Sequence, residues 1–314
     1  SETARGLIRR NADELGVIGQ AKLWRRDAAK LGPCAPMSPF GLVFMDPPYG
    51  KGLAEKALAA LVSGQWLEPG AIVVVEEASK TDLEVPEPFE IVNDAIIAML
   101  AGAVDGWGLG VVAGTSCNCW GWDKDRREGQ MTGSAMAMGE AAGGQELVAE
   151  AVKMIAREWT RRGPPTQLTQ AFVKLAGAES AADLLEGLVL ERYYLHASAA
   201  PVVFRIASDG DSVAQGLIVW AGQELGSLAI GVIRQLDLEA LEFDVVLAGS
   251  FFDGSPLVPK IMADAIHRVA PGARLVRLSV PPVVGGVLLG AEQAGINPAP
   301  LRENLVPSVQ ELLG

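Results

Sequence analysis

The sequence predicts an α/β fold built in two parts. Short apolar runs alternate with segments of helical periodicity, which is typical of sheets covered by helices. The runs bounded by turn residues are Gly41–Phe44, Ala71–Val75, Leu109–Ala113 and Phe243–Ala248. The length of 314 residues suffices for about two domains of 100–200 residues each. Val85-Pro86-Glu87-Pro88 is predicted to be a stiff connector between them, because X-Pro pairs favour extended backbone.

The first part is predicted to be an open sheet of parallel strands. A 3.6-residue period predicts a helix over 2–15, and Lys22–Arg26 is predicted to be a strand. Gly41–Phe44 is predicted to be a buried strand whose carboxyl end lies at Asp46. A helix over 53–61 and a second buried strand over 71–75 follow. Ligands of such sheets bind at the carboxyl ends of the strands, so we expect any chemistry of this part beside Asp46.

The loop Asp46-Pro47-Pro48-Tyr49 is suited to holding an exocyclic amine of a base. The Asp carboxylate and a proline carbonyl can accept its two N–H bonds, the prolines stiffen the loop, and the aromatic ring offers a stacking surface. A strand-ending turn without chemistry is the alternative interpretation.

Together with Gly50–Leu58, Trp66–Gly70 and Val73–Glu77, this loop makes residues 1–89 resemble the RsmD family of methyltransferases. The resemblance implies a partial Rossmann-type sheet and S-adenosylmethionine-dependent methylation of guanine N2 in small-subunit rRNA. The glycine-rich cofactor loop of that family lies upstream of the matching residues, so we expect an incomplete site here.

Basic residues are concentrated within the first 30 positions. Arg9, Arg10, Arg25 and Arg26 could form a patch that contacts the phosphates of rRNA, and a solvated helix face is the alternative.

The second part is predicted to open with a short helix and a hairpin, and to continue with long helices around further strands. The hairpin turn Gly114-Thr115-Ser116 offers hydroxyl groups and backbone N–H groups, so it could cradle phosphate oxygens; an ordinary hairpin is the alternative. The predicted helices are 95–101, 134–161, 182–194, 211–236, 256–269 and 282–294, the predicted strands are 109–113, 118–122, 243–248 and 274–278, and the tail 297–314 is predicted to be a short exposed helix.

Residues 90–296 resemble the BadF/BadG/BcrA/BcrD ATPase family, and within it the N-acetylglucosamine-kinase-like members. The matching stretches in chain order are Asn93-Asp94-Ala95, Val111–Asn118, Glu128–Glu140, Gly210-Asp211, Val245–Phe252 and Pro281–Gly286. The resemblance implies a lobe of the actin/hexokinase-like (ribonuclease H-like) fold that transfers phosphate from ATP, with Mg²⁺, to a small sugar.

Roles follow from this resemblance. Asp94 would be the general base and Asn93 would orient the sugar, although Asp94 alone could simply cap a helix. Gly114, Thr115 and Ser116 would contact the ATP phosphates. Ala248, Gly249 and Ser250 would lie against the adenosine, and Glu140 would lie near the sugar.

Three departures separate this part from the family pattern. Ser116 and Ser250 replace glycines, and the first phosphate-binding hairpin of the family is missing from the chain. Three hypotheses therefore stay open: a sugar kinase lobe, a methyltransferase segment, or a non-catalytic chimera, with a homodimer as one arrangement. Neither part is expected to carry a complete active site.

Composition excludes several other classes of protein. A net charge of −12 argues against a nucleic-acid surface on the acidic second part. Three cysteines cannot supply a disulfide framework or a four-ligand metal site, so we expect no metal and predict buried thiols in a reducing cytoplasm. No uninterrupted apolar run reaches about 18 residues, so no membrane span is expected; the stretch after Val276 comes nearest.

Overall fold

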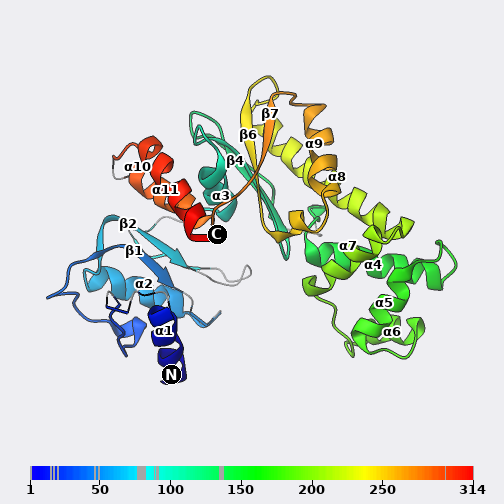
Figure 1. Ribbon diagram of the computed structural model, residues 1–314, viewed down its shortest axis with the longest axis horizontal. Helices are drawn as coiled ribbons and strands as arrows, with labels where there is room; N and C mark the ends of the chain where they lie inside the picture. The colour runs from blue at the N-terminus through cyan, green and yellow to red at the C-terminus, as the bar shows by residue number, and fades with distance from the viewer. Residues whose placement is uncertain are drawn as a thin grey trace. The chain divides into compact units, whose positions relative to one another are not determined.

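The chain divides into two compact units, Ser1–Ile91 and Val92–Gly314. The computed structural model is drawn in Figure 1. It describes residues 2–14, 16, 18–19, 21–45, 47–48, 50–75, 83–87, 89, 92–133, 138–293 and 295–313.

The first unit consists of two parallel strands with helices. The elements are α1 (Glu2–Glu14), the short 3-10 helix η1 (Ala28–Lys30), β1 (Phe40–Met45), α2 (Leu53–Ser63) and β2 (Leu67–Val75). β1 and β2 pair in parallel, as predicted, with Val43 opposite Val73. The prediction that both strands are buried is wrong, because their described side chains are exposed or half-buried, with Phe44 63% exposed. Lys22–Arg26, predicted to be a strand, forms neither helix nor strand, and all five of its side chains are exposed. The connector Val85–Pro88 lies in part outside the described residues.

The second unit is built on a five-stranded mixed sheet. Its strands are β3 (Gly108–Ala113), β4 (Cys117–Trp122), β5 (Glu128–Gln130), β6 (Phe243–Ala248) and β7 (Ala273–Arg277). Their spatial order is β5-β4-β3-β6-β7. β3, β4 and β5 pair antiparallel, whereas β6 pairs in parallel with both β3 and β7. The carboxyl ends of β3 and β6 therefore meet at one edge of the sheet.

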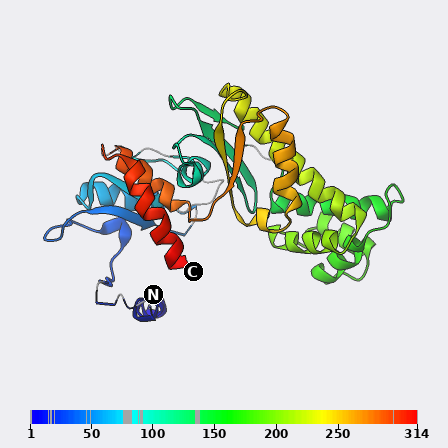
Figure 2. The same cartoon turned by 45° about the horizontal axis from the view of Figure 1, so that its top comes forward.

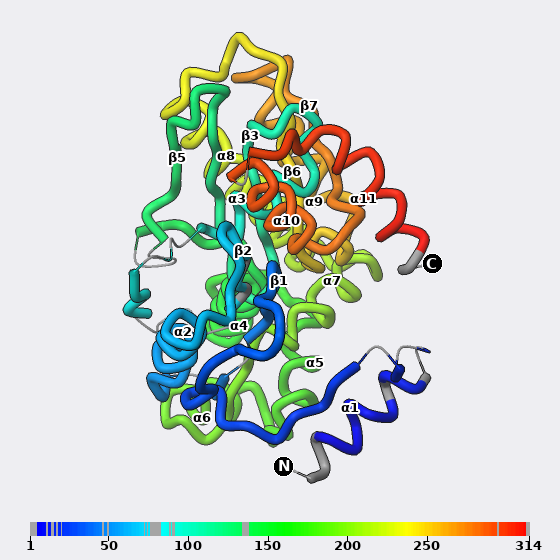
Figure 3. Tube along the Cα trace, turned by 90° about the vertical axis from the view of Figure 1, so that its left-hand side faces the viewer, coloured from blue at the N-terminus to red at the C-terminus, as the bar shows by residue number. Residues whose placement is uncertain are grey.

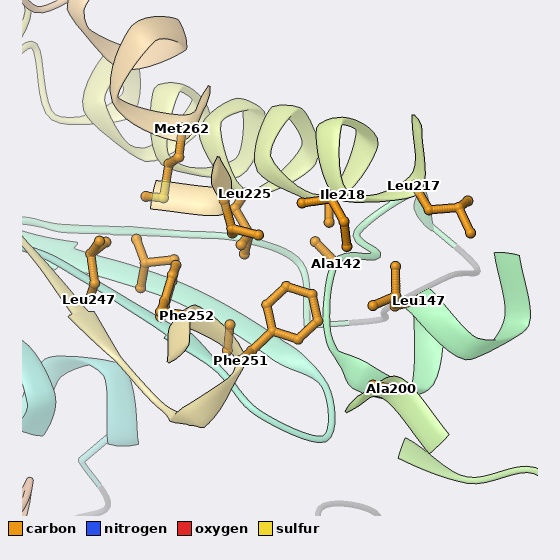
Figure 4. Close-up of a cluster of buried hydrophobic side chains, with 14 of the residues drawn as sticks. Ala142, Leu147, Ala200, Leu217, Ile218, Leu225, Leu247, Phe251, Phe252 and Met262 are labelled. Carbon is orange, nitrogen blue, oxygen red and sulfur yellow. The ribbon is translucent and has the colours of Figure 1, made fainter. Parts of the chain in front are cut away.

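Helices cover both faces of this sheet (Figure 1). α3 (Asp94–Gly102) packs on one face together with α10 (Val283–Gln293). α8 (Ser212–Gln235) and α9 (Leu257–His267) run side by side on the other face (Figure 2). Figure 4 shows Ile218 and Leu225 of α8 facing residues of β6 and of the following 3-10 turn η4 (Ser250–Asp253).

A helical subdomain extends this core. It contains α4 (Gly144–Trp159), α5 (Gln167–Ala176), α6 (Ala181–Val189), the 3-10 helix η3 (Ala197–Ala199) and α7 (Ala200–Ser208). The helix predicted over 134–161 begins only at Gly144, because Gly143 is extended and residues 141–143 form neither helix nor strand. The predicted helix 182–194 is shorter than expected and ends at Val189. The sequence-based prediction missed α5, α7 and β5.

The tail is helical, as predicted, but it is more buried than expected. α11 (Pro298–Leu313) lies along α10, as Figure 3 shows. Leu301, Leu305 and Val306 pack against a cluster formed by α3 and α10. Arg302 donates hydrogen bonds to the carbonyl oxygens of Leu100 and, at 3.0 Å, of Ala101. The predicted exposure of this helix is therefore wrong, because four apolar side chains of α11 pack against the core of the second unit.

Among the described residues, α8 is the one helix whose length and apolar composition would allow it to cross a membrane. Half of its most apolar stretch is buried inside the fold, because Leu217, Leu225 and Val232 belong to the main core cluster. α8, rather than the stretch after Val276, is thus the most apolar long segment, and the sheet accounts for its hydrophobic face.

Candidate functional site

The first turn of α3 presents two polar side chains at the edge of the sheet. Asn93 is the N-cap of α3, and its Oδ1 accepts a hydrogen bond of 2.9 Å from the backbone N–H of Ala95. Asp94 follows in the first turn with an exposed side chain. Because Asn93 already caps the helix, the carboxylate of Asp94 is not needed for capping.

Asn118 connects these two residues to the hairpin. Its side-chain amide donates to Oδ1 of Asn93 at 3.0 Å and to Oδ1 of Asp94 at 2.7 Å. Asn118 is the second residue of β4 and lies opposite Val112 of β3. Val112 in turn lies opposite Ala248 of β6. Asn118, Val112 and Ala248 therefore lie side by side on β4, β3 and β6, and this row connects the first turn of α3 with the carboxyl end of β6.

The β3–β4 turn is held against the amino end of α4. The N–H groups of Gly144 and Gln145 donate to the carbonyl oxygens of Gly114 and Thr115, both at 2.8 Å. With both carbonyl groups turned toward α4, the N–H groups of Thr115 and Ser116 make no hydrogen bond within the described part of the chain. The side chains of Thr115 and Ser116 are exposed. The turn can thus offer two amide donors to an anion.

A buried carboxylate, that of Glu146, accepts hydrogen bonds from this turn and from the residue before α4. Glu146 is 5% exposed; its Oε1 accepts from the hydroxyl of Ser116 at 3.1 Å, and its Oε2 accepts from the N–H of Gly143 at 2.9 Å. Ser116, which departs from the family pattern, therefore has a hydrogen-bond partner that glycine would lack.

Gly249 brings the end of β6 into direct contact with the end of β3. Its φ is 99°, and a Cβ at this position would lie 2.1 Å from the carbonyl oxygen of Ala113. The side chain of Arg277 holds the loop from the other side, since it donates to the carbonyl oxygens of Leu247 and Gly249 at 2.9 Å each and pairs with Asp253 at 3.0 Å. The structure thus places Ala248, Gly249 and Ser250 next to the turn Gly114–Ser116.

Glu140 is buried in the segment between β5 and α4. It is 8% exposed, and its carboxylate accepts hydrogen bonds from the N–H of Thr132 at 2.5 Å and from the hydroxyl of Thr132 at 2.7 Å. The described structure therefore ties Glu140 to the chain segment after β5, and its contact with a sugar stays a prediction.

The cysteines are free thiols in protected surroundings, as predicted. Cys34 and Cys119 are buried, and Cys117 is partly buried. Burial raises the pKa of Cys117 to about 11, with smaller contributions from the negative charges of Glu146 and Glu140. Burial also raises the pKa of Cys119. Among the described residues, no group of three His, Cys, Asp or Glu side chains is placed to hold a metal ion.

The loop predicted to act in the first unit is described only in part. Pro47 and Pro48 follow the carboxyl end of β1 without forming helix or strand, whereas Asp46 and Tyr49 lie outside the described residues. An aromatic cluster lies at the opposite, amino end of β1: Phe40 stacks on Trp66 with ring centroids 6.2 Å apart, and Arg26 lies 4.9 Å from the ring centre of Trp24. Arg9, Arg10, Arg25 and Arg26 all have exposed side chains.

A cavity of about 290 Å³ lies elsewhere in the second unit, between the end of α3, the end of β7 and α11. Ala101, Leu278 and Val306 contribute to its largely apolar wall. None of the predicted site residues lines this cavity.

Sequence reasoning missed three residues that organise the site. Asn118, Glu146 and Arg277 each act through a partner at least 24 positions away in the sequence. Glu146 carried a local signal, because an acidic residue three positions after a helix N-cap often accepts a hydrogen bond from the N-cap amide. Asn118 and Arg277 carried no comparable signal.

Comparison with known proteins assigns relatives to each part of the chain. Residues 1–98 match the family described as Conserved hypothetical protein 95. Over 55 residues the chain is 36% identical to ribosomal RNA small subunit methyltransferase D of Haemophilus influenzae, covering 18% of this chain and 28% of that enzyme.

The larger part has relatives among sugar kinases. Over 206 residues the chain is 24% identical to N-acetyl-D-glucosamine kinase of Dictyostelium discoideum, covering 64% of this chain and 65% of that enzyme. The chain thus spans slightly less than two thirds of the length of this relative. The solved structure of a candidate N-acetylglucosamine kinase from Porphyromonas gingivalis superposes with a TM-score of 0.50 at 14% identity, covering 82% of this chain and 79% of that one.

These comparisons confirm both resemblances and the predicted fold class. The chain combines a first segment similar to RsmD-type methyltransferases with a larger part that is similar to N-acetylglucosamine kinases and has an actin/hexokinase-like fold.

Proposed function

We propose that residues 92–314 form the ATP-binding lobe of a sugar kinase that acts on an N-acetylglucosamine-like sugar. One observation carries the proposal: the exposed carboxylate of Asp94, the turn Gly114–Ser116 and the close-packed Gly249 lie at the same edge of one sheet. The similarity to N-acetyl-D-glucosamine kinase over 206 residues supports the same function.

The residues present suit both the sugar that would accept the phosphoryl group and the ATP that would donate it. Asp94 would take the proton from the attacking sugar hydroxyl, and Asn93 would orient that sugar. The free amides of Thr115 and Ser116 would donate to phosphate oxygens of ATP. Gly249, where a Cβ would clash with the carbonyl oxygen of Ala113, allows the end of β6 to pack on the end of β3, so the loop proposed for the adenosine would lie next to the turn proposed for the phosphates.

Mg²⁺ is the ion that the kinase function implies. The described side chains include no cluster of His, Cys, Asp or Glu suited to a metal ion, so they do not fit a site in which protein ligands alone hold Mg²⁺. Mg²⁺ in such enzymes is commonly bound by substrate phosphates together with one or two carboxylates.

The kinase proposal is tested by thermal unfolding with ligands. We expect ATP with Mg²⁺ to raise the Tm of the full chain by several degrees, because a ligand that binds only the folded state stabilises it by mass action. Asp94→Asn should abolish sugar phosphorylation while leaving this shift intact, since Asp94 lies at the sugar end of the site. A wild-type chain that shows no shift with ATP at millimolar concentration would contradict the proposal.

A second candidate function belongs to the first unit. The match of residues 1–98 to one family and the 36% identity over 55 residues to ribosomal RNA small subunit methyltransferase D favour methylation of rRNA with S-adenosylmethionine. The exposed Arg9, Arg10, Arg25 and Arg26 would supply the contact with rRNA phosphates. A Tm shift with S-adenosylmethionine alone would select this function, and no shift with either ligand would select a non-catalytic chimera.

The place and assembly of the protein are part of the proposal. A cytoplasmic location agrees with three unpaired cysteines and with an apolar helix α8 whose hydrophobic face packs on the sheet. Sedimentation of the purified chain would decide between a monomer and a homodimer.

A further inference from the structure

The amide of Asn118 is shared between the two residues at the start of α3. Its Nδ2 lies 3.0 Å from Oδ1 of Asn93 and 2.7 Å from Oδ1 of Asp94. A carboxylate can only accept hydrogen bonds, so the atom of Asn118 that faces Asp94 must be the amide nitrogen. The two N–H groups of this amide are therefore both engaged, one with each acceptor.

This arrangement determines which atoms Asn93 turns outward. Its Oδ1 accepts from the N–H of Ala95 and from Asn118. With the oxygen occupied by these two donors, the Nδ2 group of Asn93 makes no hydrogen bond within the described residues and is available as a donor.

The same arrangement selects one oxygen of Asp94. Oδ1 is held by Asn118, whereas Oδ2 has no hydrogen-bond partner in the described part of the chain, and the side chain is exposed. The pair thus presents one donor and one acceptor side by side. A sugar hydroxyl both donates and accepts, so this polarity matches a hydroxyl group.

We propose that Asn118 is a positioning residue for phosphoryl transfer to the sugar. Its side chain fixes the rotamer of Asp94 and the amide orientation of Asn93, so that both side chains can hydrogen-bond to the sugar hydroxyl. The proposal rests on the kinase function proposed above. Asn118 acts through its two neighbours, because its own N–H groups are occupied.

A purely structural role is less compatible with the contacts. The N-cap of α3 comes from Asn93 and its bond to Ala95, and it does not need Asn118. Asn118 sits at the second position of β4, where its backbone pairs with β3 whatever side chain it carries. Loss of the side chain should therefore disturb the orientation of the polar pair more than the fold.

The main test compares Asn118→Ala with Asn118→Ser, whose hydroxyl can still donate one hydrogen bond. We expect Asn118→Ala to lower kcat for sugar phosphorylation roughly 10–100-fold, part of the effect usually ascribed to a general base. The KM for ATP should stay within about twofold, because the phosphate turn is untouched, and Asn118→Ser should recover part of the loss. Gln130→Ala removes an exposed amide from β5 of the same sheet and should leave kcat unchanged.

A double-mutant cycle separates positioning from a general loss of structure. If Asn118 acts through Asp94, Asn118→Ala should have little further effect in an Asp94→Asn background. An unchanged kcat in Asn118→Ala, or an equal loss in both backgrounds, would overturn the proposal.

One readout does not depend on activity. The side-chain amide protons of Asn118 should exchange slowly with solvent in NMR spectra of the wild-type chain, and Asp94→Ala should accelerate this exchange. If the chain shows this slow exchange but has no kinase activity, the proposed function is refuted, whereas the hydrogen bonds from Asn118 to Asn93 and Asp94 are confirmed. Fast exchange in the wild-type chain would refute the arrangement itself.

Discussion

The backbone of Gly249 packs directly on the carbonyl group of Ala113, so that a Cβ on Gly249 would lie 2.1 Å from that oxygen. This contact joins the carboxyl ends of β6 and β3, whose last paired residues are Ala248 and Val112. Because Ala113 directly precedes Gly114, the contact places the loop predicted to bind adenosine next to the turn predicted to bind phosphate. The following predictions test this and other contacts of the second unit.

Gly249→Ala should destabilise the protein by about 2–4 kcal/mol. The new Cβ would meet the backbone of Ala113, and a φ of 99° is unfavourable for any residue with a side chain. Urea denaturation measures the free energy of unfolding. The matched control is Gly231→Ala, one turn before the carboxyl end of α8, where nothing lies within 4 Å of the added Cβ; we expect it to stabilise the protein by about 0.5–1 kcal/mol. Equal stabilities of the two variants would contradict the contact.

Glu146→Ala should weaken the phosphate turn by removing two hydrogen-bond acceptors at once. The loss leaves the N–H of Gly143 without its acceptor, which typically costs about 1–3 kcal/mol. Ser116→Ala should cost about 1 kcal/mol, and the double variant should cost less than the sum of the two, because both changes remove the same hydrogen bond. Strict additivity of the unfolding free energies would show that the two side chains are not coupled.

Cys117 should react slowly with thiol reagents in the folded protein. Its pKa of about 11, against an ordinary value of 9.0, lowers the thiolate fraction at pH 8 roughly 100-fold. Reaction with a disulfide reagent, followed by mass spectrometry of the modified peptides, measures the rate at each cysteine. The control is the same reaction in guanidinium chloride, where all three thiols should react at similar rates. Rapid modification of Cys117 before unfolding would contradict its burial.

Tyr193→Phe should raise the pKa of Asp183, which lies at about 2 in the folded protein. The hydroxyl of Tyr193 donates to Asp183 at 2.7 Å and is the largest cause of this lowering, followed by the N–H of Glu179 and the side chain of Arg192. A lowered pKa in the folded state contributes stability above the unfolded value of 3.8, and this contribution is lost as the pH falls toward about 2.

The variant should therefore lose less stability between pH 4 and pH 2, roughly the window between the two pKa values. Carboxyl chemical shifts followed by NMR during an acid titration measure the pKa directly. Tyr194→Phe is the matched control, since the Tyr194 ring stacks on His196 instead. A pKa for Asp183 that is the same in both variants would refute the role of the Tyr193 hydroxyl.

Much of the fold could be predicted because several elements carry complete local signals. α8 was predicted within one residue at each end, since Asp211 caps it and apolar residues recur along one face. β6 was predicted at its observed bounds, because six consecutive buried residues form an apolar run. Where the local pattern was mixed, as at Lys22–Arg26 and around Gly139–Gly144, the predicted element was wrong or began too early.

Some missed elements did carry signals. Thr166 caps α5 through its hydroxyl group, and it follows two prolines, Pro164 and Pro165. α7 begins with a proline in its first turn, a position where its missing N–H has no cost. β5 has only three residues, which is too short for a period of two to stand out.

The sequence by itself determined elements with complete local signals such as α8 and β6, the polar loops that follow the carboxyl ends of predicted strands, and the known families that each part resembles. Local periodicity, capping residues and turn chemistry act over a few positions, so they can be identified without coordinates. Only the tertiary structure decided that Asn118 bridges Asn93 and Asp94, that Glu146 supports Ser116, and that Gly249 rests on Ala113. These contacts join residues 24 or more positions apart, and they depend on the order of strands in the sheet, which no local pattern encodes.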